Sequence, residues 1–153
     1  MAATYNNLYL DARKRLREAG VEGAQLEARE LVCCAAGKSR EQFYRDMALY
    51  ASDPVEEKLA ELLERRLAGE PVAYLIGEWE FYGLGLDITP DVLIPRMDTE
   101  VLAERAILLA RAAGEGARVL DLCAGSGCVG LAVAANVPGC RVVLADVSEA
   151  ALR

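Results

Sequence analysis

Three glycines carry the strongest chemical signal in this sequence. Gly125, Gly127 and Gly130 have the spacing G-x-G-x-x-G within residues 118–134, a segment that reads as strand, tight loop and helix. Such a loop is typical of sites where the backbone approaches a nucleotide-type ligand, because glycine lacks an obstructing side chain and the next helix offers unpaired N–H groups. The spacing alone is a weak signal.

Two carboxylates sharpen this interpretation. Asp121 lies inside the first strand, four residues before Gly125, and Asp146 ends a second apolar run over residues 142–145. An acid in the second position can accept hydrogen bonds from both hydroxyls of a ribose. An acid before the loop and another after the next strand suit S-adenosylmethionine better than NAD, and Asp121 is expected to position the loop and the cationic amino-acid end of that cofactor. An NAD enzyme and a tight turn without any ligand are the alternatives.

Composition excludes several other classes of function. The chain has 153 residues, 54% hydrophobic residues, a formal charge of −7 and no histidine. An acidic chain without a basic face is unsuited to direct nucleic-acid binding, and the lack of histidine argues against a metal site. The five cysteines lack framework spacing and indicate reduced thiols in a cytoplasmic protein. No segment suggests a signal peptide or membrane contact.

The elements around the glycine loop follow from apolar spacing and from start and stop signals. Residues 1–70 predict four short helices packed as a small bundle, with Ser39 and Gln42 forming a capping box and residues 53–56 forming another at the start of the fourth helix. The expected core side chains are Leu8, Leu16, Leu31, Phe43, Leu59, Leu63 and Leu67.

The sequence pattern changes in the middle of the chain, from helical spacing to extended segments. Aromatic residues and glycines over 72–91 predict a β-hairpin, and residues 92–94 predict an extended run that stops at Pro95. Asp98 or Thr99 is expected to cap the next helix, and Ser148 to cap another near the C-terminus. A polar turn after a buried strand is where ligand-facing residues tend to lie, which draws attention to Arg96.

Four motifs, taken in order, resemble the HemK-type protein-(glutamine-N5) methyltransferases, and most of all the members that act on peptide chain release factors. The motifs lie in residues 66–77, 80–84, 92–100 and 121–127. The resemblance implies a helical release-factor-recognition domain over 1–71, a β-hairpin linker over 72–90, and the first half of a Rossmann-like methyltransferase domain over 91–153. The cofactor would be S-adenosylmethionine.

The resemblance also implies roles for individual residues of this sequence. The residues that it assigns to cofactor binding are Asp121, Cys123, Ala124, Gly125, Ser126, Gly127 and Asp146, with Asp146 binding the ribose. Pro95, Arg96 and Thr99 would line the active site. Met97 stands where members of the family commonly have proline, and we expect little consequence.

The family's catalytic signature, Asn-Pro-Pro-Tyr, does not occur in these residues. The resemblance therefore assigns no catalytic residue here, and we expect an N-terminal fragment that is inactive alone and prone to self-association through an open sheet edge. Two alternatives remain: a glutamine methyltransferase of ribosomal proteins, and a non-catalytic module that binds a release factor. An adenine-N6 DNA methyltransferase is disfavoured by the acidic charge.

Overall fold

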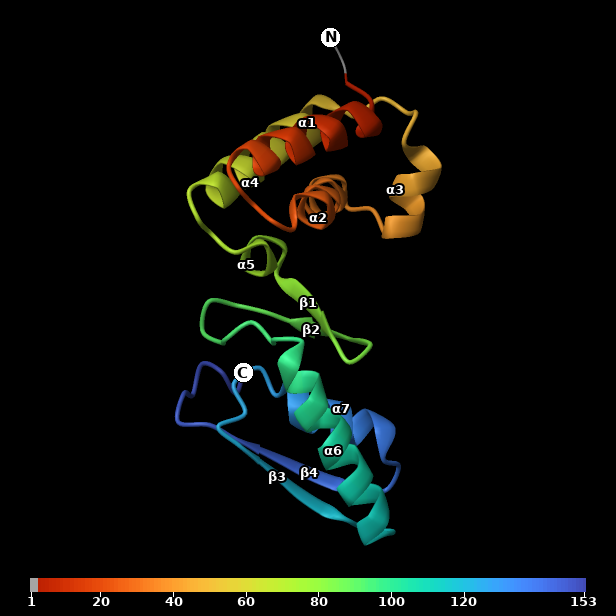
Figure 1. Ribbon diagram of the computed structural model, residues 1–153, viewed down its shortest axis with the longest axis vertical. Coiled ribbons are helices and arrows are strands. Elements are labelled where there is room, and N and C mark those ends of the chain that lie inside the picture. The colour runs from red at the N-terminus through yellow and green to blue at the C-terminus, as the bar shows by residue number, and fades with distance from the viewer. Residues whose placement is uncertain (1–2) are drawn as a thin grey trace. The chain divides into compact units, whose positions relative to one another are not determined.

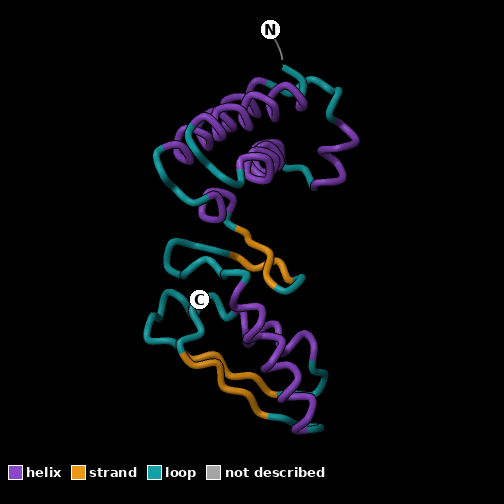
Figure 2. Tube along the Cα trace, in the orientation of Figure 1, coloured by secondary structure: helices purple, strands orange, loops and turns teal. Residues whose placement is uncertain are grey.

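A computed structural model describes residues 3–153, and the chain divides into two compact units, unit 1 (residues 1–76) and unit 2 (residues 77–153). Unit 1 is helical, and unit 2 combines two pairs of strands with two helices (Figure 1). Figure 2 shows the same division by secondary structure. The predicted combination of an N-terminal helical region and a mixed α/β region is confirmed.

Unit 1 contains five helices among its described residues: α1 (Tyr5–Glu18), α2 (Ala24–Ala36), α3 (Arg40–Asp46), α4 (Asp53–Leu67) and α5 (Val72–Ile76). Local signals set most of their ends. Gly37 ends α2 in the left-handed conformation (φ 61°), which glycine adopts without steric cost. The predicted capping box of α3 is present, because Ser39 accepts the Gln42 N–H and Gln42 accepts the Ser39 N–H.

Helix α4 begins at Asp53, as predicted, but its cap differs from the prediction. Ser52 is its N-cap residue and makes no side-chain cap hydrogen bond, so the helix does not begin with a capping box over residues 53–56. The Glu56 carboxylate instead accepts the N–H of Ala3, at 2.9 Å. The Glu56 side chain, which local spacing had assigned to the cap, therefore bonds to a residue far away in the sequence.

The core of unit 1 contains most of the predicted side chains. Leu16, Leu31 and Phe43 are at most 1% exposed, and Leu59 and Leu63 are also buried. Leu8 is half-buried. The prediction for Leu67 is wrong, because this last residue of α4 is 37% exposed.

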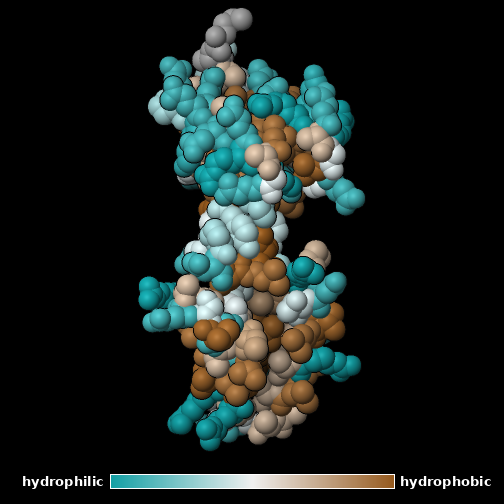
Figure 3. Space-filling model, turned by 90° about the vertical axis from the view of Figure 1, so that its left-hand side faces the viewer, coloured by the Kyte–Doolittle hydropathy of each residue, from teal (hydrophilic) through white to brown (hydrophobic). Residues whose placement is uncertain are grey.

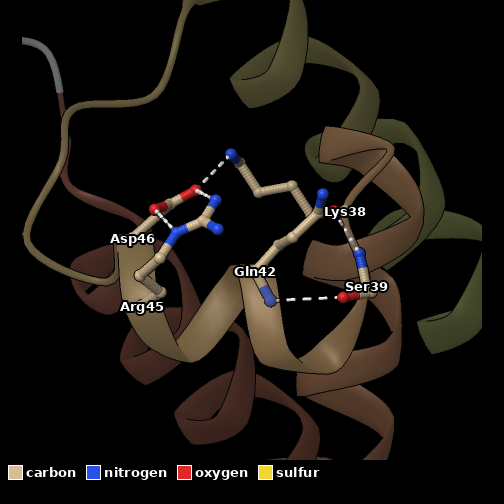
Figure 4. A network of polar contacts seen from close by, with 5 residues as sticks. All are labelled: Lys38, Ser39, Gln42, Arg45 and Asp46. Atoms are coloured by element: carbon tan, nitrogen blue, oxygen red, sulfur yellow. Dashed lines mark hydrogen bonds and ion pairs between the residues drawn. The ribbon is translucent and has the colours of Figure 1, made fainter.

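A buried acid joins three parts of unit 1 (Figure 4). Asp46, at the end of α3, accepts hydrogen bonds from Lys38 Nζ and Arg45 Nε, each at 2.8 Å. These two cations hold the pKa of the Asp46 carboxyl far below its usual range. The Lys38 ammonium also lies over the ring of Tyr5, 5.1 Å from its centre, which links the network to α1.

The hairpin is shorter than predicted. Residues 72–76 form helix α5 instead of extended chain, and the strands are β1 (Glu78–Phe81) and β2 (Leu84–Asp87). They pair antiparallel with Phe81 opposite Leu84, which leaves a two-residue turn. Residues 92–94, predicted to be extended, belong to no strand.

The rest of unit 2 is built from α6 (Asp98–Ala113), β3 (Arg118–Leu122), α7 (Cys128–Asn136) and β4 (Arg141–Ala145). Strands β3 and β4 pair in parallel, and α7 is the connection between them. Helices α6 and α7 share a core of small and branched residues: Ile107, Ala110, Ala117, Val133 and Val137. The residues after Ser148 form turns, so Ser148 caps no helix in this structure.

One face of the β3–β4 pair is bare. Leu120, Leu122 and Val143 alternate with the covered residues of their strands and are 62%, 69% and 59% exposed. Figure 3 shows hydrophobic surface gathered over unit 2, whereas unit 1 is largely hydrophilic in the same view. Within residues 3–153, no helix has the length and apolar character that crossing a bilayer requires.

Candidate functional site

The glycine loop follows β3 and is fixed by backbone contacts at both of its ends. Ala124 donates its N–H to the carbonyl oxygen of Ala145 in β4 (3.0 Å), and Gly127 donates to the carbonyl oxygen of Ala124 (2.8 Å). Cys123 has a left-handed conformation, with φ 63°, which is uncommon for a residue with a side chain. The loop therefore turns sharply where the strand ends and reaches α7 within a few residues.

Asp146 lies directly after β4 and contacts the loop. Its Oδ2 accepts the N–H of Gly125 and its Oδ1 accepts the N–H of Ser148, at 2.8 and 2.9 Å. These backbone donors lower the pKa of the Asp146 carboxyl, so the group is an anion at neutral pH. The structure thus brings together two residues, Gly125 and Asp146, that the sequence had placed in one site.

Asp121 makes a different contact. Its Oδ2 accepts the N–H of Gly130, the third residue of α7, at 2.8 Å. The N-cap position of α7 is Gly127, which has no side chain to satisfy the first N–H groups of the helix. Asp121 supplies that missing acceptor from the neighbouring strand and so fixes the start of α7 against β3.

The glycines of the motif serve two different needs. A Cβ atom at Gly130 would overlap a methyl group of Leu144, and one at Gly127 would come within 2.8 Å of the same side chain. These two glycines allow α7 to approach β4 closely. A Cβ atom at Gly125 would meet nothing within 4 Å, so the space beside the loop at that position is open.

The remaining predicted loop residues differ in exposure. Cys123 is exposed, Ser126 is half-buried and Ala124 is buried. Cys128 is buried at the start of α7, and this burial raises the pKa of its thiol. Throughout residues 3–153, no group of three or more acidic, histidine or cysteine side chains is arranged to hold a metal ion.

Pro95, Arg96 and Thr99 lie on a separate segment that leads into α6. Thr99 donates its N–H to the carbonyl oxygen of Arg96 (3.0 Å), and the Arg96 side chain is exposed. The helix begins one or two residues earlier than predicted: Met97 is the N-cap residue, without a side-chain hydrogen bond, and Asp98 is already helical. Neither Asp98 nor Thr99 is therefore the cap.

One contact next to this segment was missed from the sequence. Glu100, in the first turn of α6, accepts the backbone N–H of Tyr82 in the hairpin turn (2.9 Å). An acidic residue in the first turn of a helix ordinarily indicates only a favourable interaction with the helix dipole. No local pattern connects residues 18 positions apart, so the sequence held no usable signal for this pair.

Two family models match the chain in succession. Residues 7–77 match the PrmC N-terminal domain, and residues 95–152 match a family described as lysine methyltransferase. The first match covers most of the helical unit. The second covers the segment before α6, the glycine loop and Asp146.

Similar proteins carry one recurrent name. The chain is 40% identical over 129 residues to the release factor glutamine methyltransferase of Coxiella burnetii, and 46% identical over 134 residues to that of Bordetella pertussis. These alignments cover 84% of this chain but 46% and 47% of the relatives. The protein of the same name from Vibrio cholerae is 37% identical over 95% of this chain and 50% of its own length. The chain spans about half the length of the curated relatives that it matches.

Proposed function

We propose that this chain, whose residues 7–77 match the model of the PrmC N-terminal domain family, is part of an S-adenosylmethionine-dependent methyltransferase. Its substrate would be a glutamine side-chain nitrogen in a peptide chain release factor. Unit 1 would recognise the release factor, and unit 2 would hold the cofactor. The names of the relatives and the methyltransferase match over residues 95–152 support this proposal.

The observation that carries the proposal is the contact between the glycine loop and Asp146. The Asp146 carboxylate is charged, half-buried and fixed by two backbone donors, and a carboxylate oxygen has lone pairs left to accept ribose hydroxyls. Gly125 leaves open space beside it. An anionic acceptor next to an open glycine loop fits the ribose and amino-acid portions of S-adenosylmethionine.

Each part of unit 2 has a role in this proposal. S-adenosylmethionine supplies an electrophilic methyl group on a sulfonium sulfur. Asp146 would hold the ribose, and residues 123–127 would contact the cofactor. Pro95, Arg96 and Thr99 would line the active site. The parallel β3–α7–β4 arrangement suits the first half of a Rossmann-like domain.

The acceptor nitrogen requires help that these residues do not provide. An amide nitrogen is a poor nucleophile because its lone pair is delocalised into the carbonyl group. In the family, the Asn-Pro-Pro-Tyr signature accepts hydrogen bonds from the amide and directs it at the methyl group, which is catalysis by orientation. Because no such sequence is present in the 153 residues, we expect this chain to bind its ligands without transferring the methyl group.

Calorimetric titration of the chain with S-adenosylmethionine tests the cofactor site. Substituting Asp146→Ala should weaken binding by about 1.5–3 kcal/mol, or roughly 10- to 150-fold, because hydrogen bonds to a charged acceptor are lost. Glu149→Ala is the matched control. It also removes one negative charge, three residues after Asp146, but the Glu149 side chain is exposed. Unchanged affinity in the Asp146→Ala variant would remove the ribose assignment, and binding of NAD in place of S-adenosylmethionine would overturn the cofactor.

A second titration separates the candidate partners. A release factor and a ribosomal protein are each added to the chain, and a release factor is expected to bind more tightly. Preference for the ribosomal protein would indicate the sister activity. Binding of a release factor with no affinity for S-adenosylmethionine would indicate a non-catalytic docking module.

A further inference from the structure

The hairpin of unit 2 turns through an unusual residue. Tyr82 and Gly83 are the two residues between β1 and β2, and both have positive φ angles, 51° and 75°. Two-residue turns of this kind favour Asn-Gly or Asp-Gly, because both positions require the left-handed conformation. An aromatic side chain in the first position is strained, and such strain persists only where the surrounding structure enforces it.

Two contacts enforce it here. The backbone N–H of Tyr82 is donated to Glu100 Oε1, at 2.9 Å. The half-buried Tyr82 side chain packs against the core that α6 and α7 share. The turn is therefore attached to the body of unit 2 through both its backbone and its side chain.

Glu100 links this turn to the segment before α6. Its own N–H is donated to the carbonyl oxygen of Met97 (2.9 Å), and the N–H of Thr99 is donated to that of Arg96 (3.0 Å). The first turn of α6 has no side-chain cap. The bond to Tyr82 is thus a tertiary restraint on a helix start that lacks a local one.

We propose that Tyr82 and Glu100 are positioning residues, which hold the first turn of α6 and so place Arg96 and Thr99 in the active site. This proposal rests on the proposed function, in which Pro95, Arg96 and Thr99 line that site. The hairpin then supports the site, because its turn fixes the segment that carries Arg96 and Thr99. Neither residue needs to touch cofactor or substrate.

The arrangement fits this role better than a plain turn would. An asparagine at position 82 would adopt the turn with less strain but would lose the packing of the ring against the core. An uncapped helix start would fray without the Glu100 contact. The two unusual features, a tyrosine in a left-handed turn and an uncapped helix, are explained by one contact.

Amide hydrogen exchange and amide chemical shifts, measured by NMR on the whole chain without any ligand, test the proposal. Glu100→Ala should raise the exchange rates of the Tyr82 and Thr99 amides by about tenfold or more, because their restraint is lost. Glu100→Gln keeps an acceptor oxygen at the same place, so it should restore slow exchange. In the Glu100→Gln variant the chemical shift of the Tyr82 amide proton should still differ from that of the wild type, because its acceptor has become neutral.

Asp98→Ala is the matched control. It removes one negative charge from the same helical turn, but its side chain is exposed. The Tyr82 and Thr99 amides should exchange in this variant as in the wild type. Equal acceleration in Asp98→Ala and Glu100→Ala would overturn the proposal, because the effect would then come from helix charge alone.

Tyr82→Asn tests the other half of the pair. The hairpin ladder between Trp79 and Leu86 should stay protected, while Thr99 exchanges faster than in the wild type. Unchanged protection at Thr99 in this variant would overturn the proposal. If S-adenosylmethionine fails to bind the wild type, the proposed function fails. The exchange results still decide whether the contact between Tyr82 and Glu100 holds the first turn of α6.

Discussion

At the scale of single residues, the clearest energetic statement concerns Asp46. The carboxyl pKa is far below its usual range in the folded protein, so the folded state favours the charged form more than the unfolded state does. Its contribution to stability is therefore complete above the pKa of the unfolded chain, about 3.9. It is lost as the pH falls through the lower pKa of the folded state.

Asp46→Asn should lower the melting temperature at pH 7, because Lys38 and Arg45 lose their charged acceptor. The difference between variant and wild type should narrow as the pH is lowered below about 4. Thermal unfolding by circular dichroism at several pH values measures this. Asp11→Asn, on the exposed face of α1, is the control and should unfold like the wild type throughout. A constant difference down to pH 2 would contradict the charge argument.

Gly130→Ala should destabilise unit 2 although alanine favours helices by about 1 kcal/mol over glycine. The added methyl group meets Leu144 and lies 3.1 Å from both Asp121 Oδ2 and Val142. Overpacking of this kind costs about 1–3 kcal/mol, which exceeds the gain in helix propensity. Urea unfolding gives the free energy directly, and a more stable variant would show that the helix can move away from the sheet without cost.

The sequence drew attention to Asp121 and Asp146 because acids are rare in or beside buried strands. It could not show that Asp121 caps α7, since that contact joins two elements across space. The wrong cap at Asp98 has the same origin: several polar residues in a row offer equivalent local starts, and tertiary contacts choose among them.

At the scale of elements, helix α4 offers a direct comparison between a buried and an exposed leucine. Leu63→Ala should destabilise unit 1 by about 2–5 kcal/mol, because Leu63 is 2% exposed and its removal leaves a cavity. Leu67→Ala, one turn later on the same helix, should cost less than about 1 kcal/mol. Chemical unfolding of both variants measures the difference. Equal losses would show that the buried face of α4 is assigned wrongly.

Local signals explain which elements could be predicted. The capping box of α3 depends on neighbouring residues and was predicted correctly. Helix α5 was not, because its residues, Val-Ala-Tyr-Leu-Ile, have the composition of a strand. This helix begins instead with two N–H groups that donate to the carbonyl oxygen of Pro71. A short apolar run carries too little periodicity to distinguish the two structures.

At the scale of the whole molecule, the two units should respond independently to core substitutions. Leu16→Ala should increase amide exchange within residues 3–76, and Ile107→Ala should do so within residues 77–153, because each side chain is buried in its own unit. Exchange measured by mass spectrometry on the intact chain compares the two. A rise across both units after either substitution would show that they unfold together.

The division of the chain after residue 76 also affects the order in which its parts fold during synthesis. Ribosomes add about 5–20 residues per second, so synthesis of the 77 residues of unit 2 takes roughly 4–15 s. Helical units with local contacts fold in microseconds to milliseconds. Unit 1 can therefore complete its core on the ribosome long before the bare leucines of β3 leave the exit tunnel.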